Sequence, residues 1–253
     1  MDDSTKRFSD RVENYVNYRP AYPPELINSL IENCRFNPDS RVADIGSGTG
    51  IFSQHLLDRQ LPVIGVEPNT EMREAAETIL LNYAQFTSVA GTAEFTSLVD
   101  SSIDLITVAQ AFHWFDWPKA LAEFKRILKP QGQLALIWNR RDLKDPFQQA
   151  YEAMLRDLAP DYNLVNHMNI EVEKIAAIFD ASEYQHLSFR YTQFFDCAAF
   201  LGRMQSSSYT PVQGSEALAR LNEAAVALYE EFAVDGELAF EYTSHLYLGR
   251  LKH

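Results

Sequence analysis

The sequence predicts an α/β fold, with a mostly parallel sheet and helices on both of its faces. Residues 41–45 and 62–66 are short apolar runs, rich in β-branched side chains, that are typical of buried parallel strands. Between them, residues 51–57 carry apolar side chains at helical spacing. This succession of strand, helix and strand is typical of parallel α/β proteins.

Later segments continue the pattern. Residues 71–81 predict a helix, residues 86–91 and 103–108 predict two more strands, and a turn at 128–133 precedes a fifth. Further helices are predicted at 146–158, 169–180, 198–209 and 216–232, and strands at 186–195 and 239–248. We expect the last two strands to form the antiparallel pair that completes a seven-stranded sheet, with the intervening helices as a cap.

The composition agrees with a soluble enzyme. At 253 residues, one α/β domain with a cap is expected rather than two independent domains. The chain has 22 Lys and Arg residues against 35 Asp and Glu residues, a net charge of −13, and no dense basic run. We therefore expect neither nucleic acid nor a membrane surface as a partner.

The cysteines and the first residues add three expectations. Cys34 and Cys197 are too few and too far apart for a disulfide framework or a zinc site, so no metal is expected. The first residues are acidic and polar, and no stretch of the sequence approaches transmembrane length. A cytoplasmic location is the simplest interpretation.

The stretch Asp44-Ile45-Gly46-Ser47-Gly48-Thr49-Gly50 lies between the first predicted strand and the first predicted helix. Glycines at alternate positions let the chain turn sharply and bring backbone amides close to a ligand. The following helix directs the positive end of its dipole at the same place. A negatively charged or polar ligand, such as a nucleoside derivative, is expected over this turn.

Glu67 supports a nucleoside ligand. It stands at the carboxyl end of the second strand, 17 residues after Gly50 (67 − 50 = 17), where a carboxylate can accept hydrogen bonds from both ribose hydroxyls. Its alternative role, capping the next helix, is already filled by Asn69 or Thr70. Dehydrogenases use an acid in the same way, but their G-x-G-x-x-G pattern requires a glycine where this chain has Ile51.

The D-x-G-x-G-x-G form of the turn resembles motif I of class I S-adenosylmethionine-dependent methyltransferases, which have a Rossmann-like sheet. Residues 109–136 (AQAFHWFDWPKALAEFKRILKPQGQLAL) resemble the small-molecule enzymes related to trans-aconitate methyltransferase and the ubiquinone/menaquinone C-methyltransferases. The sequence at 109–112 departs from the N-P-P-Y-like tetrapeptide of enzymes that methylate nucleobase amines. Gln131 replaces one glycine that is usual in the turn before the fifth strand.

The resemblance implies a binding site for S-adenosylmethionine. Asp44 and the Gly46 backbone would lie near the methionine ammonium, Glu67 would hold the ribose, and Gln110 would lie against the sulfonium. Residues 92–94 would flank the adenine, although the Glu94 side chain is also suited to capping the turn that follows it. The complete expected set is Tyr18, Arg19, Asp44, Gly46, Ser47, Gly48, Gly50, Glu67, Pro68, Thr92, Ala93, Glu94, Gln110 and Ala111.

The segment Tyr18-Arg19-Pro20-Ala21-Tyr22 resembles one that closes over the cofactor in the same small-molecule group. Arg19 would pair with the cofactor's carboxylate. Tyr15, Tyr18 and Tyr22 would offer ring faces to a sulfonium or to the substrate. The alternative is a proline-stiffened linker with its tyrosines packed on the core.

Candidate substrate residues follow the fourth and fifth strands and the helix at 198–209. His113 is a candidate base, because imidazole titrates near neutrality; the alternative is that it shapes the loop with Trp114. Ser207 and Tyr209 belong either to a substrate-side segment or to a helix end. Arg140 and Arg141 either attract a substrate carboxylate or are ordinary surface charges.

The expected organisation is an N-terminal helical lid at 1–37, an S-adenosylmethionine-binding core at 38–145, and a carboxyl-terminal part at 146–253. That last part would complete the sheet and supply helical substrate-cap insertions. The expected function is methyl transfer to a small-molecule acceptor, with a carboxylic acid as one candidate. The alternatives are a non-catalytic cofactor-binding sensor or scaffold and an NAD(P)-dependent oxidoreductase. The acceptor, the methylated atom and the oligomeric state stay open.

Overall fold

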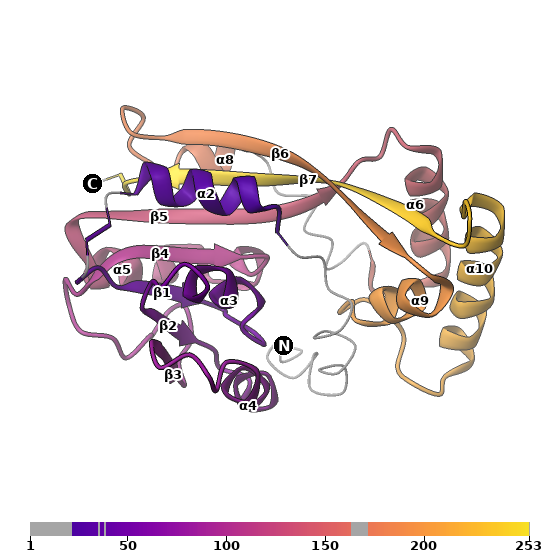
Figure 1. Ribbon diagram of the computed structural model, residues 1–253, viewed down its shortest axis with the longest axis horizontal. Helices are drawn as coiled ribbons and strands as arrows, with labels where there is room; N and C mark the ends of the chain where they lie inside the picture. The colour runs from indigo at the N-terminus through magenta and orange to yellow at the C-terminus, as the bar shows by residue number, and fades with distance from the viewer. Residues whose placement is uncertain (1–21, 35, 38, 163–171, 253) are drawn as a thin grey trace.

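A seven-stranded sheet with the order β3-β2-β1-β4-β5-β7-β6 organises the computed structural model, which describes residues 22–34, 36–37, 39–162 and 172–252 (Figure 1). Strands β1 to β5 pair in parallel, whereas β7 is antiparallel to both of its neighbours, β5 and β6. The predicted sheet, with its antiparallel last strand, is confirmed. The strands are β1 Val42–Ile45, β2 Val63–Val66, β3 Phe86–Val89, β4 Ile103–Ala109, β5 Leu128–Arg141, β6 Gln185–Phe195 and β7 Leu238–Gly249.

Helices cover both faces of the sheet because successive β5 side chains point to opposite sides. Ala135 and Ile137 pack with α2 and α3, whereas Leu136 and Trp138 pack with α5 and α8. The helices are α2 Pro24–Asn33, α3 Ile51–Leu57, α4 Thr70–Ile79, η2 Phe112–Trp114, α5 Trp117–Ile127, α6 Pro146–Leu158, α8 Val172–Ala176, α9 Cys197–Gln205 and α10 Glu216–Phe232. The predicted bounds of α3, α6 and α10 are confirmed.

Two helices are shorter than predicted. The helix predicted at 169–180 is described only as α8, at Val172–Ala176, because residues 163–171 lie outside the described part of the chain. The helix predicted at 198–209 ends at Gln205. Hydroxyl groups bind its last carbonyls: Ser206 Oγ donates to the Arg203 carbonyl at 2.7 Å, and Thr210 Oγ1 donates to the Met204 carbonyl at 2.7 Å.

The predicted turn at 128–133 is part of β5. Ile103 pairs with Leu128 and Leu105 with Gln133, so β5 advances five residues while β4 advances two. Three extra residues (5 − 2 = 3) therefore bulge out at the start of the strand. The residues predicted to form a turn before the strand therefore form an irregularity within β5.

Helices α6, α9 and α10 pack together beyond the main sheet, at the far ends of β6 and β7 (Figure 1). We call them, with those strand ends, the helical lobe. Its core is aromatic: the Phe240 ring lies 5.2 Å from that of Phe147 and 5.3 Å from that of Tyr151. Because β5 and β7 pair as far as Arg141 and Tyr242, the lobe is attached to the same sheet as β1 and β4.

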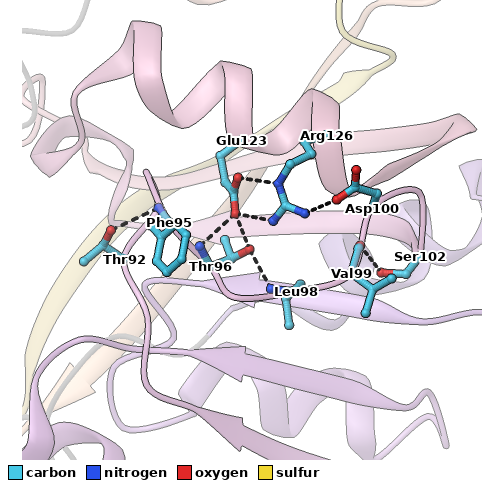
Figure 2. A network of polar contacts seen from close by, with 9 residues as sticks. All are labelled: Thr92, Phe95, Thr96, Leu98, Val99, Asp100, Ser102, Glu123 and Arg126. Carbon is cyan, nitrogen blue, oxygen red and sulfur yellow. Dashed lines mark hydrogen bonds and ion pairs between the residues drawn. The ribbon is translucent and has the colours of Figure 1, made fainter.

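An ionic network centred on the buried Glu123 attaches the connection between β3 and β4 to α5 (Figure 2). Glu123 Oε1 accepts hydrogen bonds from the Thr96 amide at 2.8 Å and the Thr96 hydroxyl at 2.6 Å. Arg126 donates to both Glu123 oxygens, at 2.8 and 2.7 Å, and also pairs with Asp100. The network therefore fixes the segment 92–102, which contains the residues expected to flank an adenine.

We predict that Glu123→Gln destabilises the fold by about 1–3 kcal/mol at pH 7, because the amide cannot replace the ionised acceptor of the Arg126 bonds. Those bonds lower the pKa of Glu123 from 4.5 to about 2. Stability from an acid with a lowered pKa is present above its unfolded pKa and is lost as the pH falls through the folded value.

Urea unfolding at a series of pH values tests this prediction. The difference between the native protein and the variant should be largest near pH 7 and shrink between about pH 4.5 and 2. Lys125→Gln, an exposed position on the same helix, is the control and should change little. A deficit that is equal at pH 7 and pH 3 would contradict the ionic origin.

Candidate functional site

The glycine turn after β1 requires glycine for two physical reasons. Gly46 and Gly50 have φ values of 70° and 83°, in the left-handed region that L side chains rarely adopt. A Cβ on Gly46 would lie 2.7 Å from the Ala111 Cβ, and a Cβ on Gly50 would lie 2.7 Å from Leu80 Cδ1. Side chains at these positions would therefore be strained and would also overlap their neighbours.

Backbone amides of the turn bond within the protein. The amides of Gly46 and Ser47 both donate to the Val66 carbonyl, at 2.8 and 3.3 Å, and the Gly48 amide donates to Glu67 Oε2 at 2.9 Å. Each of these three amides therefore already has an acceptor within the protein. The end of β2 lies close enough to the turn to accept their hydrogen bonds.

Asp44, the penultimate residue of β1, is fully buried. Its Oδ2 accepts from Ser53 Oγ at 2.7 Å and its Oδ1 accepts from Thr107 Oγ1 at 2.9 Å. Burial raises the pKa of Asp44 to about 6, although both hydroxyls and the Ser53 amide favour the charged form. Ser53 is in the first turns of α3, so a carboxylate already faces the positive end of this helix.

Glu67 follows β2 and is also buried. Besides the Gly48 amide, it accepts a hydrogen bond from the Asn69 amide on Oε1 at 2.9 Å. Burial raises its pKa, and the two amides oppose that rise. Asn69 caps α4 by accepting from the Met72 amide at 2.8 Å, so Glu67 is not the cap. Pro68 between them is exposed.

The segment after β3 is positioned by its own backbone and by α5. Thr92 is exposed and exchanges two backbone hydrogen bonds with Phe95, at 3.1 and 3.2 Å, whereas Ala93 is buried in the core. Glu94 Oε1 accepts from the Asp116 amide at 2.9 Å, just before α5. The Glu94 side chain therefore ties this segment to the start of α5.

Gln110 marks the end of β4 with a left-handed backbone (φ 59°), which is uncommon for a residue other than glycine. Its amide donates to the Ile137 carbonyl at 2.9 Å, and its Nε2 donates to the Asn139 carbonyl at 3.4 Å. Ala111 next to it faces Gly46. The carboxyl ends of β1, β2 and β4 thus bring Asp44, the glycine turn, Glu67 and Gln110 to one edge of the sheet.

The remaining sequence candidates lie elsewhere. Tyr15, Tyr18 and Arg19 fall outside the described residues. Tyr22 is buried, with its ring 5.0 Å from that of Phe52 and nearly perpendicular to it. This position agrees with the alternative in which the tyrosine packs on the core.

Candidate substrate residues are split between two places. His113 and Trp114 are in η2, with ring centroids 4.8 Å apart. Ser207 and Tyr209 follow α9 in the helical lobe, where Tyr209 meets Tyr162 edge to face at 4.8 Å. Arg141 is 8% exposed, so it is not an ordinary surface charge. Arg203, also buried, has no local sequence signal that marks it as a candidate.

The part of the chain that contains this edge is similar to known methyltransferases. Residues 43–136 match the protein-family model described as a methyltransferase domain. An uncharacterized methyltransferase of Mycobacterium tuberculosis is 40% identical over 140 residues, which cover 55% of this chain. An uncharacterized methyltransferase of Schizosaccharomyces pombe is 32% identical over 151 residues, 59% of each chain. The chain spans only 55% of the length of the Mycobacterium relative.

Solved structures show the same fold. A type II methyltransferase, so described, from Anaeromyxobacter dehalogenans has a TM-score of 0.65 at 24% identity and covers 93% of this chain and all of its own. Phosphoethanolamine N-methyltransferase 2 of Haemonchus contortus, solved with phosphomonomethylethanolamine and S-adenosylhomocysteine, has a TM-score of 0.53 at 16% identity. It covers 96% of this chain and 58% of its own.

Residues 43–136 are therefore similar to a methyltransferase domain, and the sheet that contains them has the fold of solved methyltransferases. Within the described residues, no three His, Cys, Asp or Glu side chains are grouped to hold a metal ion. No helix in the same part of the chain is long and apolar enough to cross a membrane.

We predict that Gly46→Ala destabilises the protein, because the side chain meets both an unfavourable φ and the Ala111 methyl group. Gly214→Ala is a matched control: its φ of 78° is equally unfavourable, but nothing lies within 4 Å of the new Cβ. Backbone strain should cost both variants about 1–2 kcal/mol, and overpacking should cost Gly46→Ala about 1–3 kcal/mol more. Equal urea midpoints for the two variants would contradict this packing constraint.

Proposed function

We propose that this protein transfers the methyl group of S-adenosylmethionine to a small-molecule acceptor, at the edge formed by Asp44, the glycine turn, Glu67 and Gln110. The observation that carries the proposal is chemical: this edge presents buried hydrogen-bond acceptors, and the turn amides bond inside the protein. A ligand that fits here must therefore bring donors.

The cofactor meets that requirement. Its ammonium and its two ribose hydroxyls are donors, and a carboxylate that has accepted two hydrogen bonds keeps further lone pairs. Asp44 would hold the ammonium and Glu67 the ribose, while Gly46 leaves room where a Cβ would meet Ala111. The pyrophosphate of NAD(P) would need the same amides as free donors and would face two carboxylates. The site therefore disfavours a dinucleotide.

When bound, the cofactor would supply an electrophilic methyl group on a sulfonium: the acceptor's nucleophile would bond to the methyl carbon in line as the carbon–sulfur bond breaks, and the thioether S-adenosylhomocysteine would be the leaving group. The protein's task is to orient the acceptor and exclude competing nucleophiles. Gln110, held by the Ile137 and Asn139 carbonyls, would border the reacting side. His113 is the proposed base for an acceptor whose nucleophile carries a proton.

The remaining assignments are part of the same proposal. Residues 92–94 would border the adenine, and residues 1–37 would form the lid that carries Tyr18 and Arg19. Residues 38–145 would be the cofactor-binding core and residues 146–253 the acceptor cap. The similarity of residues 109–136 to the trans-aconitate and quinone methyltransferase group supports a small organic acceptor, with carboxylic acids as the first class to test.

The first experiment is titration calorimetry of the purified chain with S-adenosylmethionine, S-adenosylhomocysteine and NADH. We expect saturable binding of the first two and none of NADH, because only the sulfur ligands carry an ammonium for Asp44, whereas NADH would bring an anionic pyrophosphate to the two carboxylates. Binding of NADH alone would overturn the proposal. Cofactor binding without methyl transfer to any member of a broad acceptor panel would favour a sensor or scaffold.

A second prediction concerns pH. The pKa of Asp44 is raised to about 6 mainly by burial, and a bound ammonium favours its ionised form. Affinity for S-adenosylhomocysteine should therefore be highest above pH 6 and fall by up to about tenfold per pH unit below it. Asp44→Asn should bind at least about tenfold more weakly at pH 8 and show a flatter profile.

Any pH dependence that persists in Asp44→Asn reports on Glu67, whose pKa is also raised by burial. Calorimetry at pH 5, 6, 7 and 8 provides the measurement, and Asp39→Asn, on an exposed turn, provides the control. An affinity that is constant from pH 5 to 8 in the unmodified protein would show that Asp44 does not hold the ammonium.

A further inference from the structure

A second concentration of buried charge lies in the helical lobe, away from Asp44 and Glu67. Two arginines are almost fully buried there: Arg141 at the end of β5 is 8% exposed and Arg203 on α9 is 6% exposed. With the aromatic side chains around them they form what we call the buried arginine cluster. Its members are Arg141, Tyr151, Glu152, Tyr162, Arg203 and Tyr242.

Only some of the hydrogen-bond donors of Arg141 have partners. Its Nη2 donates to Glu152 Oε2 and to the Tyr162 hydroxyl, and its guanidinium lies 5.0 Å from the centre of the Tyr151 ring. Its Nη1 is buried and has no hydrogen-bond partner among the described residues; the same is true of the Tyr151 hydroxyl. Buried donors of this kind cost free energy unless a partner is supplied.

Arg203 meets hydroxyl groups and aromatic rings. Its Nε donates to Tyr242 Oη at 2.8 Å and its Nη1 approaches Ser207 Oγ at 3.5 Å. Its guanidinium lies 4.9 Å from the centre of the Phe240 ring. Within the described part of the chain, no carboxylate pairs with it. Rings and hydroxyls stabilise a buried cation less than an anion does.

The charge balance of the buried arginine cluster indicates which kind of ligand would complete it. Among the described residues of the cluster, two buried guanidiniums face one carboxylate, Glu152, which also pairs with the exposed Arg156, so this group has an excess of one positive charge (2 − 1 = 1). An isolated buried charge is costly, and an anion bound with forked guanidinium donors removes that cost. One carboxylate matches an excess of one, whereas a doubly charged phosphate would overcompensate it.

The cluster adjoins the proposed methyl-transfer edge. Asn139, whose carbonyl accepts from Gln110, and Arg141 are two residues apart on β5 and point to the same face of the sheet. The rise of a strand places their Cα atoms about 7 Å apart. A small molecule could therefore reach both places, with its anionic end on the arginines and its nucleophile near Gln110.

We propose that the buried arginine cluster binds a carboxylate of the methyl acceptor, with Arg141 and Arg203 as the residues that select for this group. The inference rests on the proposed function, because it places the acceptor's nucleophile at the Gln110 side. The carboxylate serves as the anchor, and a different atom of the acceptor takes the methyl group.

The test uses the full chain saturated with S-adenosylhomocysteine and titrated with acetate, butyrate and benzoate, each beside its carboxamide. We expect at least one carboxylate to bind and its carboxamide to bind at least about tenfold more weakly, because the amide carries no charge. Arg203→Gln should weaken carboxylate binding at least tenfold while leaving the affinity for S-adenosylhomocysteine unchanged. Arg220→Gln, an exposed arginine on α10, is the matched control and should have no effect.

Each outcome decides between the two proposals. If S-adenosylhomocysteine binds but no carboxylate does, the cluster is a structural element and the inference fails while the proposed function stands. Preference for inorganic phosphate over every carboxylate would overturn the assignment of the anion. Carboxylate binding that depends on Arg203, in a protein that does not bind S-adenosylhomocysteine, would support the cluster and defeat the proposed function. The comparison of acid with amide needs no variant, so it stands even if Arg203→Gln does not fold.

Discussion

The carboxylate of Glu67 is the contact on which the whole edge depends. It accepts hydrogen bonds from Gly48, in the turn after β1, and from Asn69, in the turn after β2. One buried side chain therefore joins the ends of two neighbouring strands. Burial raises its pKa and the two backbone donors act against that rise. The glycine turn is consequently held by the protein itself, so a ligand of the kind proposed would meet a site that is already ordered.

Much of this arrangement was predictable from local patterns. The limits of α3, α6 and α10 follow from helical spacing and from the residues next to their first turns; Asp145 and Ser215 cap α6 and α10. The strands follow from short β-branched runs between turns. The positions of Asp44, Glu67 and Gln110 follow from where those strands end.

The rest depended on contacts between segments that are distant in sequence. The turn amides donate to Val66 and Glu67, and only the pairing of β1 with β2 brings those acceptors within reach. Arg203 meets Tyr242, 39 residues later, because α9 folds back over β7. Neither Arg203 nor Tyr242 carries a periodic or motif signal, so a single sequence gives no reason to select these two residues.

The connection between β6 and β7 has a consequence for how such a protein can change over evolutionary time. Phe195, the last residue of β6, is paired directly with Leu238, the first residue of β7, and all of α9 and α10 lies between them. The segment between β6 and β7, which contains α9 and α10, therefore begins and ends at neighbouring positions of the sheet. A gene segment of different length or content could be exchanged there without disturbing the ladder of β5, β7 and β6. The segment that holds α9 and α10 can therefore diverge among descendants of one ancestor while the edge containing Asp44 and Glu67 is inherited intact.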